Sequence, residues 1–199
     1  MVKFRTEIIE KKVPKDQRIE ELKYWCGEFH RLNLAPPHKG GTLGNLSFRL
    51  KNGEDSFIIT GSRVGLKYKL SDDCFVAVHS CDLKEGIVFA HGTKEPSSES
   101  RLHFAIYNRR KDVNAIFHGH SREILACPDK LKIPETKQKA PHGSIELAQS
   151  VLEILDDEFF LVMKDHGFIS IGKTMKEAGE LTLEMYKKCL DESGNIHDK

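Results

Sequence analysis

The sequence predicts a single α/β domain with a central, mainly antiparallel β-sheet flanked by helices. Short apolar runs of strand length are joined by turn signals that suit hairpins, and only a few amphipathic helical segments interrupt them. Because strand and helix do not alternate regularly, a doubly wound parallel sheet is not expected. The 199 residues are enough to bury one core. We therefore expect one domain over residues 1–199, with its core between about residues 15 and 192.

The N-terminal half is predicted to contain one helix followed by four strands. Residues 16–33 carry apolar side chains at helical spacing. This apolar stripe consists of Ile19, Leu22, Cys26 and Phe29. The stretch PPHKGGTLGN ends the helix, and LSFRL and SFIIT follow as strands whose linker, KNGED, has an Asn-Gly pair typical of a tight hairpin. CFVAVHS and GIVFAHG predict two more strands.

The C-terminal half is predicted to contain three helices and three strands. PSSESRLHFAIYNRR has helical periodicity, and VNAIFHGH follows it as a strand. SIELAQSVLEILDD predicts an amphipathic helix with Ser144 as its N-cap. EFFLVMKDHG and FISIG predict a closing pair of strands. In the last segment, TMKEAGELTLEMYKKCL, Thr174 and Glu177 stand at capping-box spacing at the start of a final helix.

The composition excludes several classes of partner. With 31 basic and 30 acidic residues the net charge is +1, so no overall field attracts nucleic acid or a membrane surface. The five cysteines are odd in number and contain no C-x-x-C pair, which disfavours a disulfide framework and fits a cytoplasmic setting. No apolar run approaches the roughly 20 residues that span a bilayer, and the start, MVKFRTEIIEKK, does not resemble a signal peptide.

The stretch NAIFHGHSREILAC places His118 and His120 at the end of a predicted strand. Side chains two residues apart leave the same face of a strand, so these imidazoles could share one metal ion, although such pairs are also common on protein surfaces. Catalytic zinc commonly has three protein ligands and one open position. Three histidines that precede a glycine compete for the third place: His91, His142 and His166. His166 has the best context, because it lies in a break between two apolar runs.

Glu99 and its neighbours suggest an anion site beside these histidines. Ser97, Ser98 and Glu99 stand at the start of a predicted helix, where ordinary helix capping explains all three. The alternative is that the hydroxyls and the helix N-terminus bind an anion such as phosphate, while Glu99 works as an acid/base. The GGTLGN stretch supports the alternative, because its glycines let backbone N–H groups approach an anion and Thr42 and Asn45 add donors.

Four motifs occur in one order along the chain: G-G-T-x-G-N-x-S, P-S-S-E, H-x-H and H-G. From about Leu22 to Leu190 the chain resembles the class II aldolase/adducin superfamily, whose enzyme type is L-fuculose-1-phosphate aldolase. The resemblance implies that Glu99 is the catalytic acid/base, and that Zn²⁺, or in its place Mn²⁺, Co²⁺ or Fe²⁺, is the cofactor. The implied metal ligands are His118, His120 and His166. The implied phosphate-binding positions are Thr42, Asn45, Ser62, Ser97 and Ser98.

By the same resemblance, the protein is a homotetramer that cleaves a sugar 1-phosphate into dihydroxyacetone phosphate and an aldehyde through a metal-stabilised enediolate. Other members of the superfamily are a ribulose-phosphate 4-epimerase and a methylthioribulose-phosphate dehydratase, so epimerisation and dehydration are the alternative reactions that the resemblance allows. Adducin-type heads are non-catalytic binding modules that lack the metal histidines. This chain retains all three histidines and Glu99, which favours an enzyme.

The chain departs from the family pattern in two places. Between His120 and His166 there is no tyrosine, whereas family aldolases have one there that protonates the aldehyde. After Ser62, the residues Arg63 and Val64 replace the Thr-Gly that often follows. A basic cluster lies in the same region and consists of Arg63, Lys67 and Lys69. Most such clusters are simply solvated, but one of the three could add charge to phosphate binding.

Overall fold

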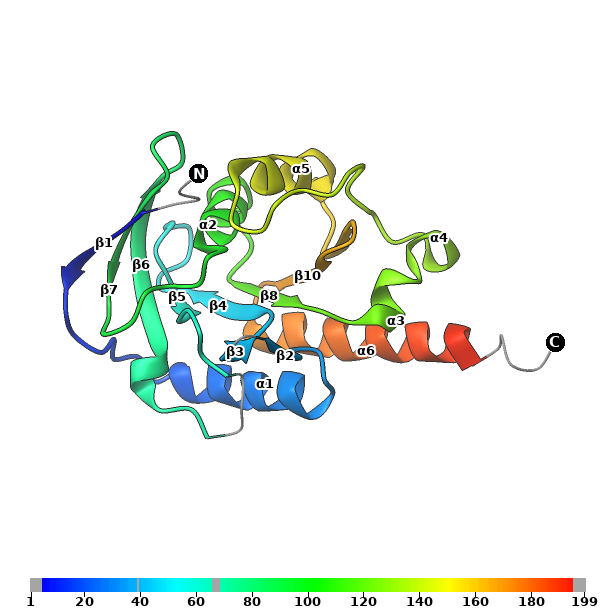
Figure 1. The fold of residues 1–199 in the computed structure, drawn as a ribbon, viewed down its shortest axis with the longest axis horizontal. Coiled ribbons are helices and arrows are strands. Elements are labelled where there is room, and N and C mark those ends of the chain that lie inside the picture. The colour runs from blue at the N-terminus through cyan, green and yellow to red at the C-terminus, as the bar shows by residue number, and fades with distance from the viewer. Residues whose placement is uncertain (1–4, 39, 66–68, 195–199) are drawn as a thin grey trace.

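The computed structural model describes residues 5–38, 40–65 and 69–194 (Figure 1). Its strands are β1 (Arg5–Glu10), β2 (Pro37–His38), β3 (Gly41–Thr42), β4 (Asn45–Arg49), β5 (Phe57–Thr60), β6 (Phe75–Asp82), β7 (Ile87–His91), β8 (Ala115–Gly119), β9 (Phe160–Met163) and β10 (Gly167–Gly172). Its α-helices are α1 (Ile19–Arg31), α2 (Ser100–Arg109), α3 (Arg122–Leu125), α4 (Pro128–Leu131), α5 (Ile145–Leu155) and α6 (Met175–Gly194). A short 3₁₀ turn spans Asp72–Cys74.

Eight strands form one sheet in the order β1-β7-β6-β5-β4-β8-β10-β9. In this order, every pair of neighbouring strands from β7 through to β9 is antiparallel. Strand β1, at the edge of the sheet, runs parallel to β7. The predicted fold class, one α/β domain with a mainly antiparallel sheet and flanking helices, is confirmed. Strand β1 was not predicted and lies upstream of residue 15, so the sheet begins earlier in the chain than the expected core.

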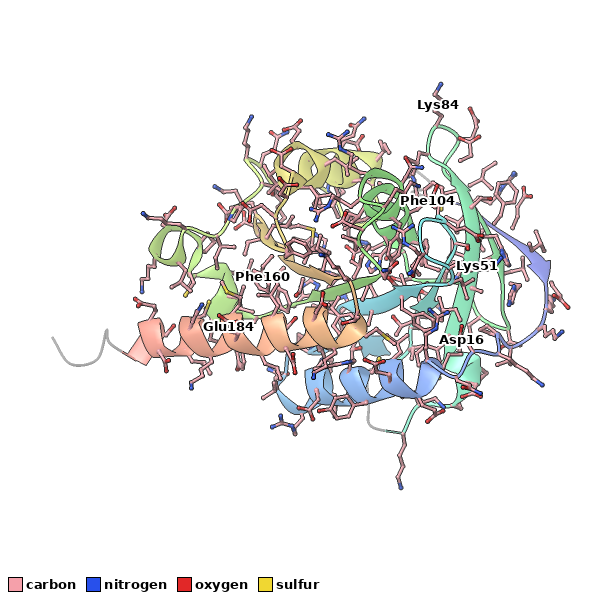
Figure 2. All side chains as sticks on the ribbon, turned by 180° about the vertical axis from the view of Figure 1, so that it is seen from behind. Asp16, Lys51, Lys84, Phe104, Phe160 and Glu184 are labelled. Atoms are coloured by element: carbon pink, nitrogen blue, oxygen red, sulfur yellow. The ribbon has the colours of Figure 1, made fainter. Side chains whose placement is uncertain are left out.

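Helices cover both faces of the sheet. In Figure 1, α1 and α6 lie side by side on one face, while α2 and α5 pack together on the other. Each face has its own apolar cluster, one built around the α1 and α6 side and one around the α2 and α5 side. Figure 2 shows Phe160 inside the first cluster and Lys84 pointing away from the body at the turn between β6 and β7. The sheet is therefore the middle of three layers.

Local sequence signals account for the main helices. The apolar stripe predicted for α1 is buried. The Ser144 hydroxyl accepts a hydrogen bond from the Leu147 N–H at 3.1 Å, which makes Ser144 the predicted N-cap of α5. At the start of α6 the Thr174 hydroxyl accepts one from the Glu177 N–H at 3.1 Å. None of the helices in the described ranges has the length and apolarity needed to cross a membrane.

Arg49 of β4 is a charged residue inside the core. Its guanidinium donates hydrogen bonds to the carbonyls of Val113 at 2.8 Å, Tyr107 at 3.0 Å and Arg110 at 2.8 Å, and also to that of Glu54. It stacks on the Tyr107 ring at 4.6 Å from the centroid. The guanidinium thereby joins the β4–β5 turn to the end of α2. Without it, these carbonyls would be left without hydrogen-bond donors.

We predict that Arg49→Met lowers the free energy of unfolding by about 3 kcal/mol, because it leaves several buried carbonyls without donors. The measurement is urea denaturation followed by circular dichroism. The control is Arg5→Met, which removes an exposed ion pair with Glu7 and should leave the unfolding midpoint unchanged. Equal midpoints for both variants would show that the Arg49 network contributes nothing to stability.

Candidate metal centre

His118 is fixed at the centre of the sheet. It lies in β8, which is paired on one side with β4 and on the other with β10, so that Asn45 and Ile169 are its cross-strand partners. The residue is fully buried. Its Nδ1 lies 2.8 Å from the Phe168 carbonyl oxygen. Because a carbonyl only accepts, Nδ1 must carry the proton, and the Nε2 lone pair is free to bind a cation.

The other two histidines come from the ends of neighbouring segments. His120 follows β8 directly, and its backbone N–H donates to the Leu34 carbonyl at 2.8 Å. His166 lies in the turn between β9 and β10, and its N–H donates to the Met163 carbonyl at 3.0 Å. The turn passes through Asp165, whose φ is +53°. Backbone hydrogen bonds thus place both rings at the end of the sheet where β8 finishes and β10 begins.

The three imidazoles converge on one point. Each of His118, His120 and His166 offers a ring nitrogen, and these atoms all lie within 4.8 Å of one another. The ring centroids are separated by 4.7 Å for His118 and His120, and by 5.2 Å for each of the other two pairs. Three nitrogens in this arrangement match the ligand set that zinc and similar divalent cations use.

Glu99 lies against two of these rings. Its carboxylate oxygens are 3.0 Å from Nε2 of His118 and 2.9 Å from Nε2 of His166. The side-chain amide of Asn45 donates to the same carboxylate at 2.9 Å. Although Glu99 occupies the N-cap position of α2, its side chain makes no capping hydrogen bond. Ordinary capping therefore does not account for this carboxylate.

The buried polar atoms at this point are incompletely satisfied. Nε2 of His118 and Oε1 of Glu99 approach other polar atoms closely, but neither has a hydrogen bond of acceptable geometry within the described residues. Buried polar atoms without partners are unusual and demand an explanation. A divalent cation accepts lone pairs from both kinds of atom, so the residues present fit a metal ion well.

Charges in the cluster shift the pKa values in opposite directions. Burial alone would raise the pKa of Glu99, but its interactions with the imidazoles of His118 and His166 outweigh burial and hold that pKa well below its usual value. Burial would lower the pKa of His118, yet the Glu99 carboxylate and the Phe168 carbonyl raise it. Burial and the neighbouring imidazoles lower the pKa of His120 to about 3. Glu99 is therefore an ionised carboxylate in the metal-free site.

Glycines allow the backbone to pack this closely around His118. A Cβ on Gly167 would lie 2.4 Å from the Gly119 carbonyl oxygen and 2.8 Å from a carbon of the His118 ring. A Cβ on Gly119 would lie 2.5 Å from the Phe168 ring. The glycine after His166 and the one between the paired histidines are thus steric requirements of the site.

A cavity of about 540 Å³ opens beside the cluster and contains Glu99, His120 and His166 in its wall. The sequence-predicted phosphate positions also line it: Thr42, Asn45, Ser62, Ser97 and Ser98. Sequence reasoning missed three other polar residues of the wall, which are His38, Lys139 and Asp165. Asp165 could have been noticed beside His166, whereas Lys139 lies in a loop without any local signal.

The other two candidate histidines and the basic cluster do not belong to the three-imidazole cluster. His142 lines the cavity but does not belong to the three-imidazole cluster. His91 lies elsewhere, with its Nδ1 2.6 Å from Nε2 of His79 on the neighbouring strand. Of the basic cluster, Arg63 lines the cavity, and Lys67 lies outside the described residues.

The family model for the class II aldolase and adducin N-terminal domain matches residues 20–190. The chain belongs to this family. An L-fuculose phosphate aldolase of Methanococcus maripaludis is 31% identical over 152 residues, which cover 69% of this chain and 77% of the relative. A 5-methylthioribulose-1-phosphate/5-deoxyribulose-1-phosphate aldolase of Rhodospirillum rubrum is 29% identical over 179 residues, covering 75% of this chain and 73% of the relative.

A solved structure of an L-fuculose 1-phosphate aldolase has the same fold. It superposes with a TM-score of 0.72 at 19% sequence identity and covers 92% of this chain and 88% of the other. At this identity the likeness establishes the fold alone. Family membership, together with the histidine cluster, indicates a metal-dependent enzyme of the class II aldolase family.

We predict that Gly167→Ala weakens zinc binding at least tenfold, because the added methyl group forces the β9–β10 turn away from His118. Zinc affinity is measured by competition with a chromophoric chelator. The control is Gly53→Ala, at a turn where a Cβ would meet nothing within 4 Å. Undiminished zinc affinity in Gly167→Ala would contradict the packing described here.

We also predict that zinc binding releases protons at pH 7 and weakens as the pH falls. The reason is that the raised pKa of His118 favours its protonated form, whereas a metal ligand must be neutral. Calorimetric titrations in buffers of different ionisation enthalpy measure the release. In Glu99→Gln the carboxylate that raises this pKa is gone, so the release should shrink. Identical heats in all buffers would contradict the charge assignment.

Proposed function

We propose that the protein is a divalent-metal-dependent aldolase, with zinc as the first candidate ion, that reversibly cleaves a ketose 1-phosphate into dihydroxyacetone phosphate and an aldehyde. The observation that carries the proposal is the convergence of His118, His120 and His166 beside the buried carboxylate of Glu99. The names of the related proteins from M. maripaludis and R. rubrum support L-fuculose 1-phosphate and 5-deoxyribulose 1-phosphate as substrates to test first.

The proposed metal ligands are His118, His120 and His166. A bound divalent cation would supply Lewis-acid chemistry, drawing electron density from the substrate's carbonyl oxygen and making the neighbouring C–H bond acidic. The protein's own contribution is to hold the imidazoles in the neutral tautomer that can bind, which the Phe168 carbonyl does for His118. The cavity leaves room for substrate on the side of His120 and His166.

Glu99 is proposed to carry the proton of the reacting carbon. In the condensation direction its ionised carboxylate removes a proton from the carbon next to the carbonyl of dihydroxyacetone phosphate. The electron pair released then forms the new carbon–carbon bond to the aldehyde, whose oxygen takes up a proton from solvent and becomes a hydroxyl. In cleavage that hydroxyl gives its proton to solvent, the carbon–carbon bond breaks, and the protonated Glu99 returns its proton to the same carbon. Asn45 orients the carboxylate by its hydrogen bond.

The phosphate group is proposed to bind where three serines from two segments line the cavity: Ser62, Ser97 and Ser98. Thr42 lies beside them, with its hydroxyl donating to the Val64 carbonyl at 3.3 Å. Binding the phosphate there would fix the distance between the reacting carbon and Glu99, which converts binding energy into orientation.

We predict that the protein loaded with zinc releases dihydroxyacetone phosphate from L-fuculose 1-phosphate or 5-deoxyribulose 1-phosphate. Glu99→Gln should lower kcat by a factor of about 10² to 10⁴ while the zinc content stays the same, since it removes the proton carrier but no histidine. The measurement is a coupled reduction of dihydroxyacetone phosphate, and Glu146→Gln on the exposed face of α5 is the matched control. Epimerised or dehydrated sugar phosphate in place of dihydroxyacetone phosphate, seen by NMR, would assign the site to another reaction of the family.

We further propose that the chain assembles as a homotetramer. Light scattering coupled to size-exclusion chromatography measures the mass directly, and a monomer of 22.6 kDa would contradict the proposal.

A further inference from the structure

Arg63 has an unusual backbone conformation for its residue type. Its φ is +58°, in the left-handed region that glycine adopts freely and that other L-residues adopt only at a cost. The residue follows Ser62 directly and lines the cavity beside the metal centre. Non-glycine residues held in such conformations concentrate at functional sites, where the surrounding structure maintains them.

The surrounding segments fix this conformation. The Ser62 N–H donates to the Glu95 carbonyl at 2.7 Å, which ties the start of the turn to the segment before α2. On the other side, a Cβ on Gly41 would lie only 3.0 Å from the Arg63 backbone, so the GGTLGN segment packs directly onto the turn. Glycine at position 63 would satisfy the same geometry without strain. The stability of the fold therefore gives no reason for an arginine here.

The charge pattern of the cavity supplies such a reason. Arg63 is exposed and lines the cavity, and none of the carboxylates in the described ranges forms an ion pair with it. Lys139 is the other lysine or arginine among the described residues that line this space. The hydroxyls of Ser62 and Ser98 can donate hydrogen bonds to an anion, but they cannot balance its charge.

We infer that Arg63 is a specificity-determining residue, whose guanidinium selects a doubly charged phosphate ester over neutral and singly charged analogues. A guanidinium can donate two parallel hydrogen bonds to a phosphate and remains charged at every working pH. Next to Ser62, it adds a fixed positive charge to a cavity wall that also contains the acidic residues Glu99 and Asp165. The inference deepens the proposed function and rests on its placement of the phosphate group.

The test is Arg63→Gly, which removes the charge and relieves the backbone at once. Binding of dihydroxyacetone phosphate and of inorganic phosphate to the zinc-loaded protein is measured by calorimetry, with uncharged dihydroxyacetone as the reference. Arg63→Gly should bind both phosphates at least tenfold more weakly, while dihydroxyacetone binding is unchanged. Its thermal midpoint should equal or exceed that of the wild type, because glycine removes the strain.

Lys132→Gly is the matched control. Lys132 is an exposed cation with φ of +53° at the end of α4, and it does not line the cavity. Its replacement removes the same charge and relieves the same kind of backbone strain, and it should leave phosphate binding unchanged. Arg63→Lys, which keeps the charge but loses the planar fork, should bind phosphate with intermediate affinity and serves as the second variant if the glycine variant does not fold.

Phosphate binding does not require turnover, so the outcome is separate from that of the cleavage assay. A protein that binds dihydroxyacetone phosphate in an Arg63-dependent way but cleaves no sugar phosphate would refute the aldolase proposal and leave this inference intact. Equal phosphate affinity in Arg63→Gly and the wild type would overturn it. So would an equal loss in Lys132→Gly, an equal loss of dihydroxyacetone binding, or a wild type that binds no phosphate.

Discussion

The hydrogen bond from His118 Nδ1 to the Phe168 carbonyl is the interaction on which the candidate site depends. It joins β8 to β10 in the middle of the sheet and, in the neutral form of this fully buried ring, leaves Nε2 as the nitrogen that can bind a cation. His120 and His166 stand at the ends of the same two strands, so the pairing of β8 with β10 also sets their distance from His118. The geometry of the cluster is thus a property of strand register rather than of flexible loops.

The same arrangement has a cost in the metal-free protein. A buried carboxylate oxygen, Oε1 of Glu99, and a buried ring nitrogen, Nε2 of His118, lack hydrogen bonds of acceptable geometry, and buried polar atoms of this kind generally destabilise a fold by about 1–3 kcal/mol each. The backbone also packs closely here, because a Cβ on Gly44 would lie only 2.7 Å from the His118 carbonyl oxygen. A cation that satisfies these atoms binds the folded chain and not the unfolded one, so ligand binding and folding are coupled here.

Much of this structure was predictable from periodicity and turn chemistry. The helical stripe of α1, the N-cap at Ser144 and the hairpin between β4 and β5 were all predicted from local spacing. Strand β1 was missed because its sequence, RTEIIE, is short and half charged, and it joins the sheet only through distant pairing with β7. Helices α3 and α4 were missed because each has a single turn, too short for a periodic signal.

The candidate site shows the same division between local and long-range information. The sequence marked His166 because a break between two apolar runs exposes a side chain, but it could not choose between capping and chemistry for Glu99. An acidic residue at the N-cap of α2 suits both roles, and only the tertiary contacts with His118 and His166 distinguish them. Lys139 joins the cavity from a loop distant in sequence, which no local pattern encodes.

A crystal structure of the zinc-loaded protein, with anomalous data collected on both sides of the zinc absorption edge, tests the metal centre most directly. We expect one strong zinc peak at about 2.0–2.1 Å from a ring nitrogen of each of His118, His120 and His166, next to the carboxylate of Glu99. A zinc peak bound elsewhere, or three rings that remain without an ion at saturating zinc, would contradict the claim that these imidazoles form one metal centre.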